Sequence, residues 1–489
     1  MKIALPRKLA LVVSLTLGLT GFHSTPAVEV KEDSFAPNPV YDIDPAEAAR
    51  NQHYDQPERP QFHYTPIQGH IGDATGLIFY QGEYHLFYMS DKWERRRNRH
   101  KCWGHAISRD LLHWEELPSV LDPVLDHLPG SGSGVVDWNN ALKLEKGNDK
   151  TLVIFYTDYA IGSCIAYSND AGRTWTRHPR NPFLAGTKEI RDPKVFWYAP
   201  AKEWRMIRYE NKDFVFYGAP DLFSWRELSR IGGYYECPDL FELPVEGKSG
   251  ERKWVLCGAD AGYMLGSFDG VAFKPETGML HAELNAPGTF YAPQTWTKPG
   301  EQESSVVQMG FLNHPRASHL TWHNQMAFPV TLTLRPTAEG VRLYREPVPE
   351  LATLRTESKT WQNLTLKGGD NPLAEIRGDL FEIRAEIDFG AATACTLGVR
   401  GQSIRFAANG QCNVAGLKKE LGLTDHHLAV QLLVDRSSME LFLDHGRASI
   451  SKCVFFDSEN QSFSLTSEGG EIRVVSLEVN RLKSVWPKK

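Results

Sequence analysis

The sequence predicts an all-β protein built as a five-bladed β-propeller followed by a C-terminal β-sandwich. Three observations support this fold class: a hydrophobic strand recurs five times in the first part of the chain, turn residues separate the copies at even spacing, and strict polar–apolar alternation follows. The 489 residues also exceed what one hydrophobic core usually supports. We therefore expect two folded domains.

The recurring unit is a hydrophobic strand after a charged turn, and it returns at roughly fifty to seventy residues, the range of propeller blades. Its five copies are 83–88, 152–156, 204–207, 254–256 and 305–309. In four of them an aspartate turn toward an outer strand follows, at Asp110, Asp170, Asp221 and Asp269. Five copies of a four-stranded unit favour a propeller over residues 57–350.

After residue 350 the pattern changes to alternation with a period of two. Apolar residues occupy every second position of 381–389 and again of 428–434. This period is typical of half-buried antiparallel strands. Residues 351–489 are therefore predicted to form the β-sandwich.

The N-terminus has the organisation of a secretory signal peptide. Basic residues, an apolar run and small residues follow one another at Lys2, Arg7 and Lys8, at 9–19, and at Thr25 and Ala27. We expect a signal peptide over 1–27, a leader over 28–56 and a secreted or periplasmic protein. No segment is long and apolar enough to predict a membrane span.

Charge and cysteine usage bear on partners and cofactors. The 54 Lys and Arg against 60 Asp and Glu give a net charge of -6, so no global basic field favours nucleic acid as a partner. The seven cysteines lack metal-site spacing, and we expect neither a metal nor another cofactor. Cys395 and Cys412 are candidates for a bridge between two strands, but the sequence does not define the pairing.

Three acidic residues stand where the first strands of different blades begin. Asp73 precedes the run 77–80, Asp192 precedes 195–197, and Glu236 precedes 240–241. Because the innermost strand of each propeller blade starts near the axis, we expect these acids to converge on one mouth. For any single acid the simpler interpretation is a turn cap, as we expect for Asp110 and Asp221.

Converging carboxylates indicate a reaction. Retaining glycoside hydrolysis requires two of them on either side of the scissile bond, one to attack the anomeric carbon and one to protonate the leaving oxygen. Their separation in such enzymes is roughly 5 Å. A third carboxylate is available to bind ring hydroxyls.

The segments around these acids resemble glycoside hydrolase family 32, the family of invertases, inulinases and levanases. The similar motifs occur in the family's order and cover nearly the whole chain after the leader: Phe62-His63-Tyr64-Thr65-Pro66, Tyr84-His85-Leu86-Phe87-Tyr88, Trp103-Gly104-His105-Ala106, Arg191-Asp192-Pro193, Glu236-Cys237-Pro238-Asp239, Phe290-Tyr291-Ala292 and 435–442. Single tripeptides are weak signals, whereas their joint order and spacing are specific.

The resemblance implies a secreted retaining hydrolase that releases fructose from β-fructans of the levan or inulin type, or from sucrose-like sugars, through a covalent fructosyl-enzyme intermediate. It implies Asp73 as the nucleophile, Glu236 as the acid/base and Asp192 as the residue that binds fructose hydroxyls and stabilises the transition state. The substrate-binding residues that it implies are Arg191, Ser131, Ser133, Trp103, Tyr291 and Cys237.

The chain departs from the family pattern beside these residues. The family's asparagine before the nucleophile is Gly72, its Phe-Ser-Gly-Ser is 130–133 with glycine first, and the acid before Phe-Tyr-Ala is Thr289. We interpret this as a rebuilt sugar pocket around retained acids. The sequence leaves open the β-2,6 or β-2,1 linkage, exo or endo attack, and the oligomeric state.

Two other interpretations stay open. One is a non-catalytic carbohydrate-binding propeller, and the other is a fructosyltransferase that passes the same intermediate to a sugar hydroxyl. The basic run Arg95-Arg96-Arg97-Asn98-Arg99-His100-Lys101 adds a further question. It would favour anionic sugars if it lay at the mouth, although a solvated loop is the simpler interpretation.

Overall fold

The computed structural model describes residues 54–91, 101–122, 127–285, 288–296, 306–315, 320–421 and 426–486, which are almost entirely β-structure. Two short 3-10 helices are also present, η2 (Ala199–Ala201) and η3 (Pro349–Leu354). The expected signal peptide, residues 28–53 of the expected leader, and 95–100 of the basic run lie outside the described residues. Within the described ranges no helix is long and apolar enough to cross a membrane.

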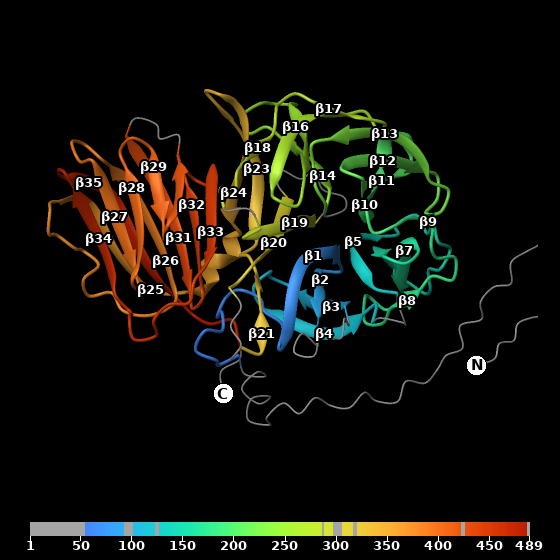
Figure 1. Cartoon of the computed structure of the whole chain (residues 1–489), viewed down its shortest axis with the longest axis horizontal. Helices are drawn as coiled ribbons and strands as arrows, with labels where there is room; N and C mark the ends of the chain where they lie inside the picture. The colour runs from blue at the N-terminus through green and yellow to red at the C-terminus, as the bar shows by residue number, and fades with distance from the viewer. Residues whose placement is uncertain are drawn as a thin grey trace, which may run out of the picture. The chain divides into compact units, whose positions relative to one another are not determined.

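The strands from β1 to β24 form five sheets, which follow one another from blue to yellow in Figure 1. The first sheet contains β1 (Gly69–Tyr80), β2 (Glu83–Asp91), β3 (Lys101–Ser108), β4 (Trp114–Val120) and β21 (Trp322–His323). The second contains β5 (Pro129–Val136), β6 (Leu152–Asp158), β7 (Gly162–Ser168), β8 (Thr176–Arg177) and β9 (Leu184–Ala185). The third contains β10 (Ile190–Tyr198), β11 (Glu203–Glu210), β12 (Asp213–Ala219) and β13 (Arg226–Gly232).

The fourth and fifth sheets complete this part of the chain. The fourth contains β14 (Asp239–Pro244), β15 (Arg252–Cys257), β16 (Gly262–Phe268), β17 (Phe273–Pro275) and β18 (Leu280–His281). The fifth contains β19 (Phe290–Trp296), β20 (Val306–Leu312), β22 (Gln325–Met326), β23 (Val330–Thr337) and β24 (Gly340–Pro347). The all-β propeller prediction is confirmed, and five sheets are consistent with five blades.

The recurrent sequence unit corresponds to the second strand of each sheet, namely β2, β6, β11, β15 and β20. The aspartates that follow it cap turns: Asp221 Oδ1 accepts the backbone N–H groups of Phe223 and Ser224 at 2.7 and 2.6 Å. Asp110 does the same for Leu112 and His113. Turn capping therefore explains both aspartates, as the sequence predicted.

The first strands of the sheets contact one another and form the centre of the propeller. Strand β1 contacts both β5 and β19, and β5 contacts β10. The two-residue strand β21, from the segment after β20, pairs in parallel with the start of β1 through Gly69 and Trp322. This pairing ties the last sheet of the propeller to the first.

The remaining strands form the two sheets of the sandwich. The six-stranded sheet contains β25 (Arg355–Leu366), β35 (Ile472–Leu482), β26 (Phe381–Asp388), β31 (His427–Asp435), β32 (Ser438–Leu443) and β33 (Ala448–Cys453). The five-stranded sheet contains β30 (Leu417–Glu420), β29 (Gln411–Val414), β28 (Gln402–Ala407), β27 (Ala394–Val399) and β34 (Phe463–Glu468).

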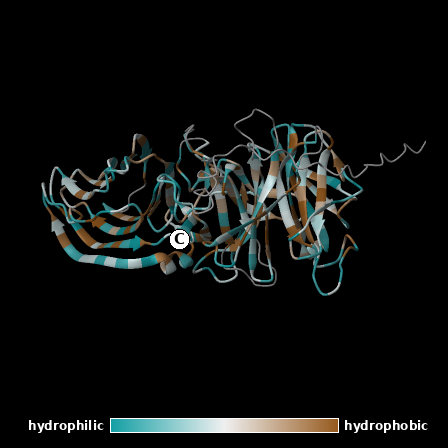
Figure 2. Cartoon of the chain, turned by 90° about the horizontal axis from the view of Figure 1, so that it is seen from below, coloured by the Kyte–Doolittle hydropathy of each residue, from teal (hydrophilic) through white to brown (hydrophobic). Residues whose placement is uncertain are grey.

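The alternating segments of the sequence pair with each other in this sandwich. Ile383 of β26 faces Leu432 of β31, and Ala385 faces Val430, and all four side chains belong to the core between the sheets. Figure 2 shows brown and teal segments along the strands of the chain. Period-two patterning therefore identified the strands and also the face that is buried.

The cysteines do not form disulfides. All seven thiols are free and buried. Cys395 lies on β27 and Cys412 on β29, and Phe406 of the intervening β28 pairs with both. The candidate bridge is wrong because a third strand separates the two residues.

A buried histidine joins the propeller to the sandwich. His63 Nδ1 lies 2.8 Å from Asp435 Oδ2 and His63 Nε2 lies 2.5 Å from Glu440 Oε1. Asp435 also accepts the backbone N–H groups of Gln61, Phe62 and His63. Burial by itself would lower the pKa of His63, but the hydrogen bonds to the two carboxylates outweigh it and raise the pKa to about 9.

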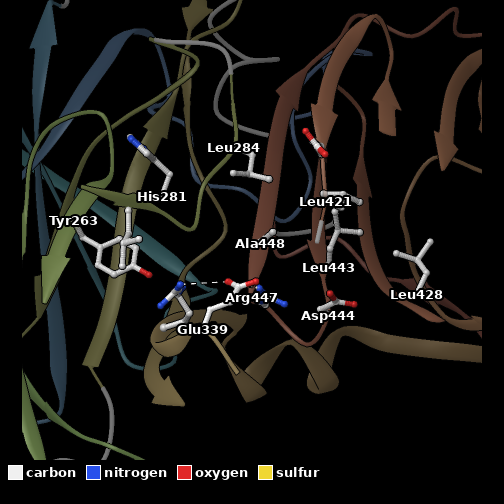
Figure 3. A pocket seen from close by; sticks show the side chains of 13 residues that line it. Tyr263, His281, Leu284, Glu339, Leu421, Leu428, Leu443, Asp444, Arg447 and Ala448 are labelled. Atoms are coloured by element: carbon white, nitrogen blue, oxygen red, sulfur yellow. Dashed lines mark hydrogen bonds and ion pairs between the residues drawn. The ribbon is translucent and has the colours of Figure 1, made fainter. Parts of the chain in front are cut away.

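A second polar contact crosses the same junction. Glu283, which precedes β19, accepts hydrogen bonds from Arg345 of β24 and from Ser449 of β33. A small pocket of about 260 Å³ lies beside it (Figure 3), where Glu339 pairs with both Arg342 and Arg447. The contacts of Glu283 with Ser449 and of Glu339 with Arg447 thus link the last propeller sheet region to β33 and its preceding turn.

We expect replacement of His63 by Ala to destabilise the protein by about 3 kcal/mol near neutral pH, because it leaves two buried carboxylates without their shared partner. A raised pKa contributes stability that is fully present below the unfolded value of 6.5 and is lost as the pH rises through about 9. The difference in unfolding free energy between the two proteins should therefore be largest at about pH 6 and shrink by about pH 10.

Denaturant unfolding at the two pH values measures this difference. His113→Ala is the control, because His113 pairs with Asp110 at the surface and its loss should change stability by no more than about 0.5 kcal/mol. If the loss of unfolding free energy in His63→Ala were the same at both pH values, it would contradict the raised pKa of His63.

Candidate active site

Two of the predicted acids lie inside β-bulges. The pairing of β1 with β2 shifts register between Ile71 and Ala74, around Asp73, and that of β10 with β11 shifts between Arg191 and Lys194, around Asp192. A bulge redirects the side chain of the extra residue. The sequence placed both acids before their strands, and this is wrong because the bulge interrupts the alternation that marks a strand.

The third acid stands on a turn with unusual backbone angles. Glu236 and Cys237 precede β14 and have φ values of 51° and 45°. Asp192 likewise has a φ of 60°. Residues other than glycine rarely adopt this left-handed region, and such strain tends to gather at functional sites.

Cys237 connects the acids. Its backbone N–H donates to Asp192 Oδ2 at 3.1 Å. Its Sγ lies 3.8 Å from Asp192 Oδ2 and 3.8 Å from Asp73 Oδ2. Residues from β1, β10 and the turn before β14 therefore meet in space, as the sequence predicted.

The Glu236 carboxyl is held at both oxygens. Arg191 donates to Oε1 through Nη2 at 2.6 Å and through Nε at 3.1 Å, and the Tyr291 hydroxyl donates to Oε2 at 2.8 Å. The Arg191 guanidinium also lies over the ring of Tyr209, 4.4 Å from its centre. Glu236 is thus fixed in position by groups from β10 and β19.

Burial and mutual repulsion change the acidity of this cluster. Burial raises the pKa of Asp73, the Glu236 charge adds to the increase, and the Ser131 hydroxyl, which donates to Asp73 Oδ2 at 2.6 Å, opposes it. Burial, together with the charges of Asp73 and Glu236, raises the pKa of Asp192 to about 7. Burial also raises the pKa of the Cys237 thiol.

Two further predicted residues lie behind the cluster. The Ser133 hydroxyl donates to the backbone oxygen of Pro193 at 2.8 Å and accepts the N–H of Val195 at 2.9 Å, which joins β5 to β10. Trp103 is fully buried and its indole N–H donates to the oxygen of Gly130 at 3.1 Å. The polar atoms of both side chains are therefore hydrogen-bonded to backbone groups.

The structure adds Tyr235 and Tyr159, which sequence reasoning missed, and Lys101, which it named only as the end of the basic run. Tyr235 is exposed next to Glu236, and its hydroxyl accepts a hydrogen bond from Arg191 Nη2 at 3.3 Å. The charges of Asp192 and Asp73 add to the effect of burial in raising the pKa of Tyr159. Burial raises the pKa of Asp73, and the charge of Lys101, whose ammonium lies 6.0 Å from the Tyr159 ring centre, partly opposes this rise.

Only some of these residues had a signal in the sequence. Tyr235 adjoins Glu236, and Lys101 ends the basic run, whose remaining arginines lie outside the described residues. Tyr159 stands in a turn after β6 and belongs to no motif.

The space beside Gly72 is taken by another side chain. A Cβ built on Gly72 would lie 3.2 Å from His70 Cε1 and 3.4 Å from Met89 Cβ. His70 thus stands where the family pattern would lead us to expect an asparagine side chain. Across the described ranges, no group of three or more His, Cys, Asp and Glu residues is arranged to hold a metal ion.

Known proteins are similar to this chain in sequence and in fold. The chain is 34% identical over 495 residues to a levanase of Bacillus subtilis, which covers 90% of this chain and 73% of that protein. It is 27% identical to the extracellular exo-inulinase of Aspergillus niger, over 88% of this chain and 96% of that protein. The crystal structure of the exo-inulinase from Aspergillus awamori superimposes with a TM-score of 0.78 at 23% identity, over 88% of this chain and all of that one.

Two family models account for most of the chain. The N-terminal domain model of glycosyl hydrolases family 32 matches residues 63–347, and the C-terminal model of the same family matches 350–481. The first match covers all five propeller sheets and the acids, and the second covers both sandwich sheets apart from the last residue of β35. The chain is therefore an O-glycosyl hydrolase that belongs to glycosyl hydrolases family 32.

Proposed function

We propose that this protein is a retaining hydrolase that releases fructose from β-fructans or sucrose-like sugars. The observation that carries the proposal is the meeting of Asp73, Asp192 and Glu236 around Cys237. The levanase and exo-inulinase relatives support the substrate class.

In the proposed first step, a carboxylate oxygen of Asp73 attacks the anomeric carbon of the fructosyl unit. The Glu236 carboxyl gives its proton to the leaving oxygen as the glycosidic bond breaks. In the second step the Glu236 carboxylate takes a proton from water, which attacks the same carbon and frees Asp73. Each of the two displacements inverts the configuration at the anomeric carbon, so the two steps together retain it.

The neighbouring residues have supporting roles in this proposal. Asp192 binds ring hydroxyls and stabilises the positive charge that develops on the sugar ring. Arg191 and Tyr291 position Glu236 through the contacts to its two oxygens. Ser131 favours the ionised form of Asp73, which the attack requires, through its 2.6 Å hydrogen bond.

Export is part of the proposal. The basic, apolar and small residues of 1–27 follow the order of a signal peptide, and one curated relative is an extracellular exo-inulinase. A secreted or periplasmic enzyme also suits a polymeric substrate that does not enter cells.

Two other functions use the same site. A fructosyltransferase would give the covalent intermediate to a sugar hydroxyl instead of water, and it would build trisaccharides from sucrose alone. A non-catalytic propeller would bind sugar without turnover. The hydrolase is favoured over binding alone because both the nucleophile and the acid/base positions keep their carboxyl groups.

We expect the protein to release fructose from levan, inulin or sucrose, and Asp73→Ala to lower that rate by about 10⁴-fold or more on every substrate, because the covalent step is lost. Chromatography of the products measures both points. Asp110→Ala is the matched control, since it removes an aspartate that only caps a turn. Full activity in Asp73→Ala would exclude the assignment, and longer saccharides formed from sucrose would indicate transfer.

Glu236→Gln should reduce kcat/KM on sucrose by about 10² to 10⁴-fold, the usual contribution of a general acid. The loss should be smaller on an aryl fructoside with a good leaving group, because that group departs without protonation. Azide, which needs no general base, should speed release of the covalent intermediate. Equal losses on sucrose and the aryl fructoside, without azide rescue, would count against Glu236 as the acid/base.

Ser131→Ala should move the acidic limb of the kcat/KM profile to higher pH by about one unit, since it removes a hydrogen bond to the charged form of Asp73. The sign follows from the requirement for an ionised nucleophile, because a higher pKa means that protonation inactivates the enzyme at a higher pH. Ser133→Ala is the control, because that hydroxyl contacts only the backbone of β10 in the structure. Identical acidic limbs for wild type and Ser131→Ala would contradict the role of Ser131.

A further inference from the structure

A second cavity lies farther along the same inner strands that carry the acids. Its volume is about 420 Å³, and later residues of β1, β5, β10 and β14 line it: 77–79, 134–136, 195–197 and 240–242. Ile78 is five residues beyond Asp73 and Phe196 is four beyond Asp192. At about 3.3 Å per strand residue the cavity is at most roughly 13 to 16 Å along the strands from the Cα atoms of Asp192 and Asp73, because the register shifts shorten this path.

Four tryptophans, Trp138, Trp197, Trp204 and Trp254, stand among the mostly apolar residues that line this cavity. Trp138 and Trp197 both line it and are 47% and 38% exposed, and they are two of the four large hydrophobic residues that are exposed in the described part of the chain. Trp197 packs edge-on against Trp204, with 5.3 Å between ring centres. Exposed aromatic surface that gathers at one cavity indicates a binding site rather than scattered surface residues.

Polar groups occur among these rings. Trp204 also lines the cavity, and its indole N–H is buried without a hydrogen-bond acceptor among the described residues. A buried donor without an acceptor is costly, and here it lies in a residue of the cavity wall. Asn139 and the Glu242 carboxylate, which Arg252 holds at 2.8 Å, supply further hydrogen-bonding groups.

We propose that this cavity is a second, non-catalytic saccharide-binding site that takes a segment of a fructose-containing oligosaccharide or polysaccharide. A sugar presents C–H faces that pack on flat aromatic rings and hydroxyls that can bind the side chains of Asn139 and Glu242. The volume lies within the range of small-molecule sites. The choice of a fructose-containing ligand rests on the proposed function.

A second site has a defined consequence for a polymeric substrate. A chain held at one site has a raised effective concentration at another, whereas a disaccharide is too short to span the distance along the strands between the two sites. The cavity should therefore affect the binding of fructan and leave the hydrolysis of sucrose unchanged.

Calorimetry with the full chain carrying Asp73→Ala tests binding without turnover. An inulin-type tetrasaccharide should occupy two sites, and adding Trp138→Ala and Trp197→Ala should weaken one of them by about tenfold or more. Trp138→Phe and Trp197→Phe keep an aromatic face and should retain most of the affinity. Val271→Ala, which removes an exposed apolar side chain that does not line the cavity, is the control.

Kinetics provide a second readout. In the enzyme with Asp73 intact, the two Trp→Ala changes should raise KM for inulin or levan several-fold and change kcat/KM for sucrose by less than about twofold. Thermal unfolding of the same variants shows whether they remain folded. If the Ala variants do not remain folded, two other measurements decide the question. The first is tetrasaccharide binding by the Phe variants, and the second is protection of Trp138 and Trp197 from chemical oxidation when sugar is bound.

Three outcomes would overturn the proposal: one tetrasaccharide site that the tryptophan changes do not affect, equal losses on sucrose and polymer, or a cavity that binds an apolar peptide and no saccharide. Failure of the proposed function is distinguishable, because a protein that hydrolyses neither fructan nor sucrose can still bind the tetrasaccharide at Trp138 and Trp197.

Discussion

Three carboxyl groups in one small volume repel one another, and the arrangement of the propeller centre depends on how that repulsion is offset. Each acid has its own donor: Arg191 for Glu236, the Ser131 hydroxyl for Asp73 and the Cys237 backbone N–H for Asp192. These donors do not remove the effect of burial, since the pKa of Asp192 stays raised to about 7. The Asp192 carboxyl can therefore hold a proton near neutral pH.

This arrangement requires register shifts in the strands and residues with left-handed backbone angles. Register shifts surround Asp73 on β1, Ser131 on β5 and Asp192 on β10, so three neighbouring strands turn a side chain toward the same region. Beyond the bulges the same strands regain regular pairing, and their later residues form the wall of the tryptophan-lined cavity. One set of strands thus supports two different chemical environments, polar and strained at its start and aromatic farther along.

Some motifs that resemble the family serve the fold rather than the site. Asp435 and Glu440, from the motif in the sandwich, hold His63, from the first motif of the propeller, although 372 residues separate His63 from Asp435. Both carboxylates are buried and their histidine has a raised pKa. This contact explains why the two motifs occur together: it joins the segment before β1 to β31 and β32 of the sandwich.

The sequence by itself determined the all-β class, the faces of the sandwich strands and the aspartate turns, because alternation and turn chemistry are local properties of the chain. It also predicted that the three acids would converge, although it placed Asp73 and Asp192 before their strands rather than within them. Tertiary structure alone decided that Asp73 and Asp192 lie in bulges, that Arg191 and Tyr291 contact Glu236, and that Ser133 and Trp103 bind backbone oxygens. It also decided that Trp138 and Trp197 share a cavity. Each of these depends on which strand lies beside which, and that pairing joins residues distant in the chain, whose contacts no local pattern encodes.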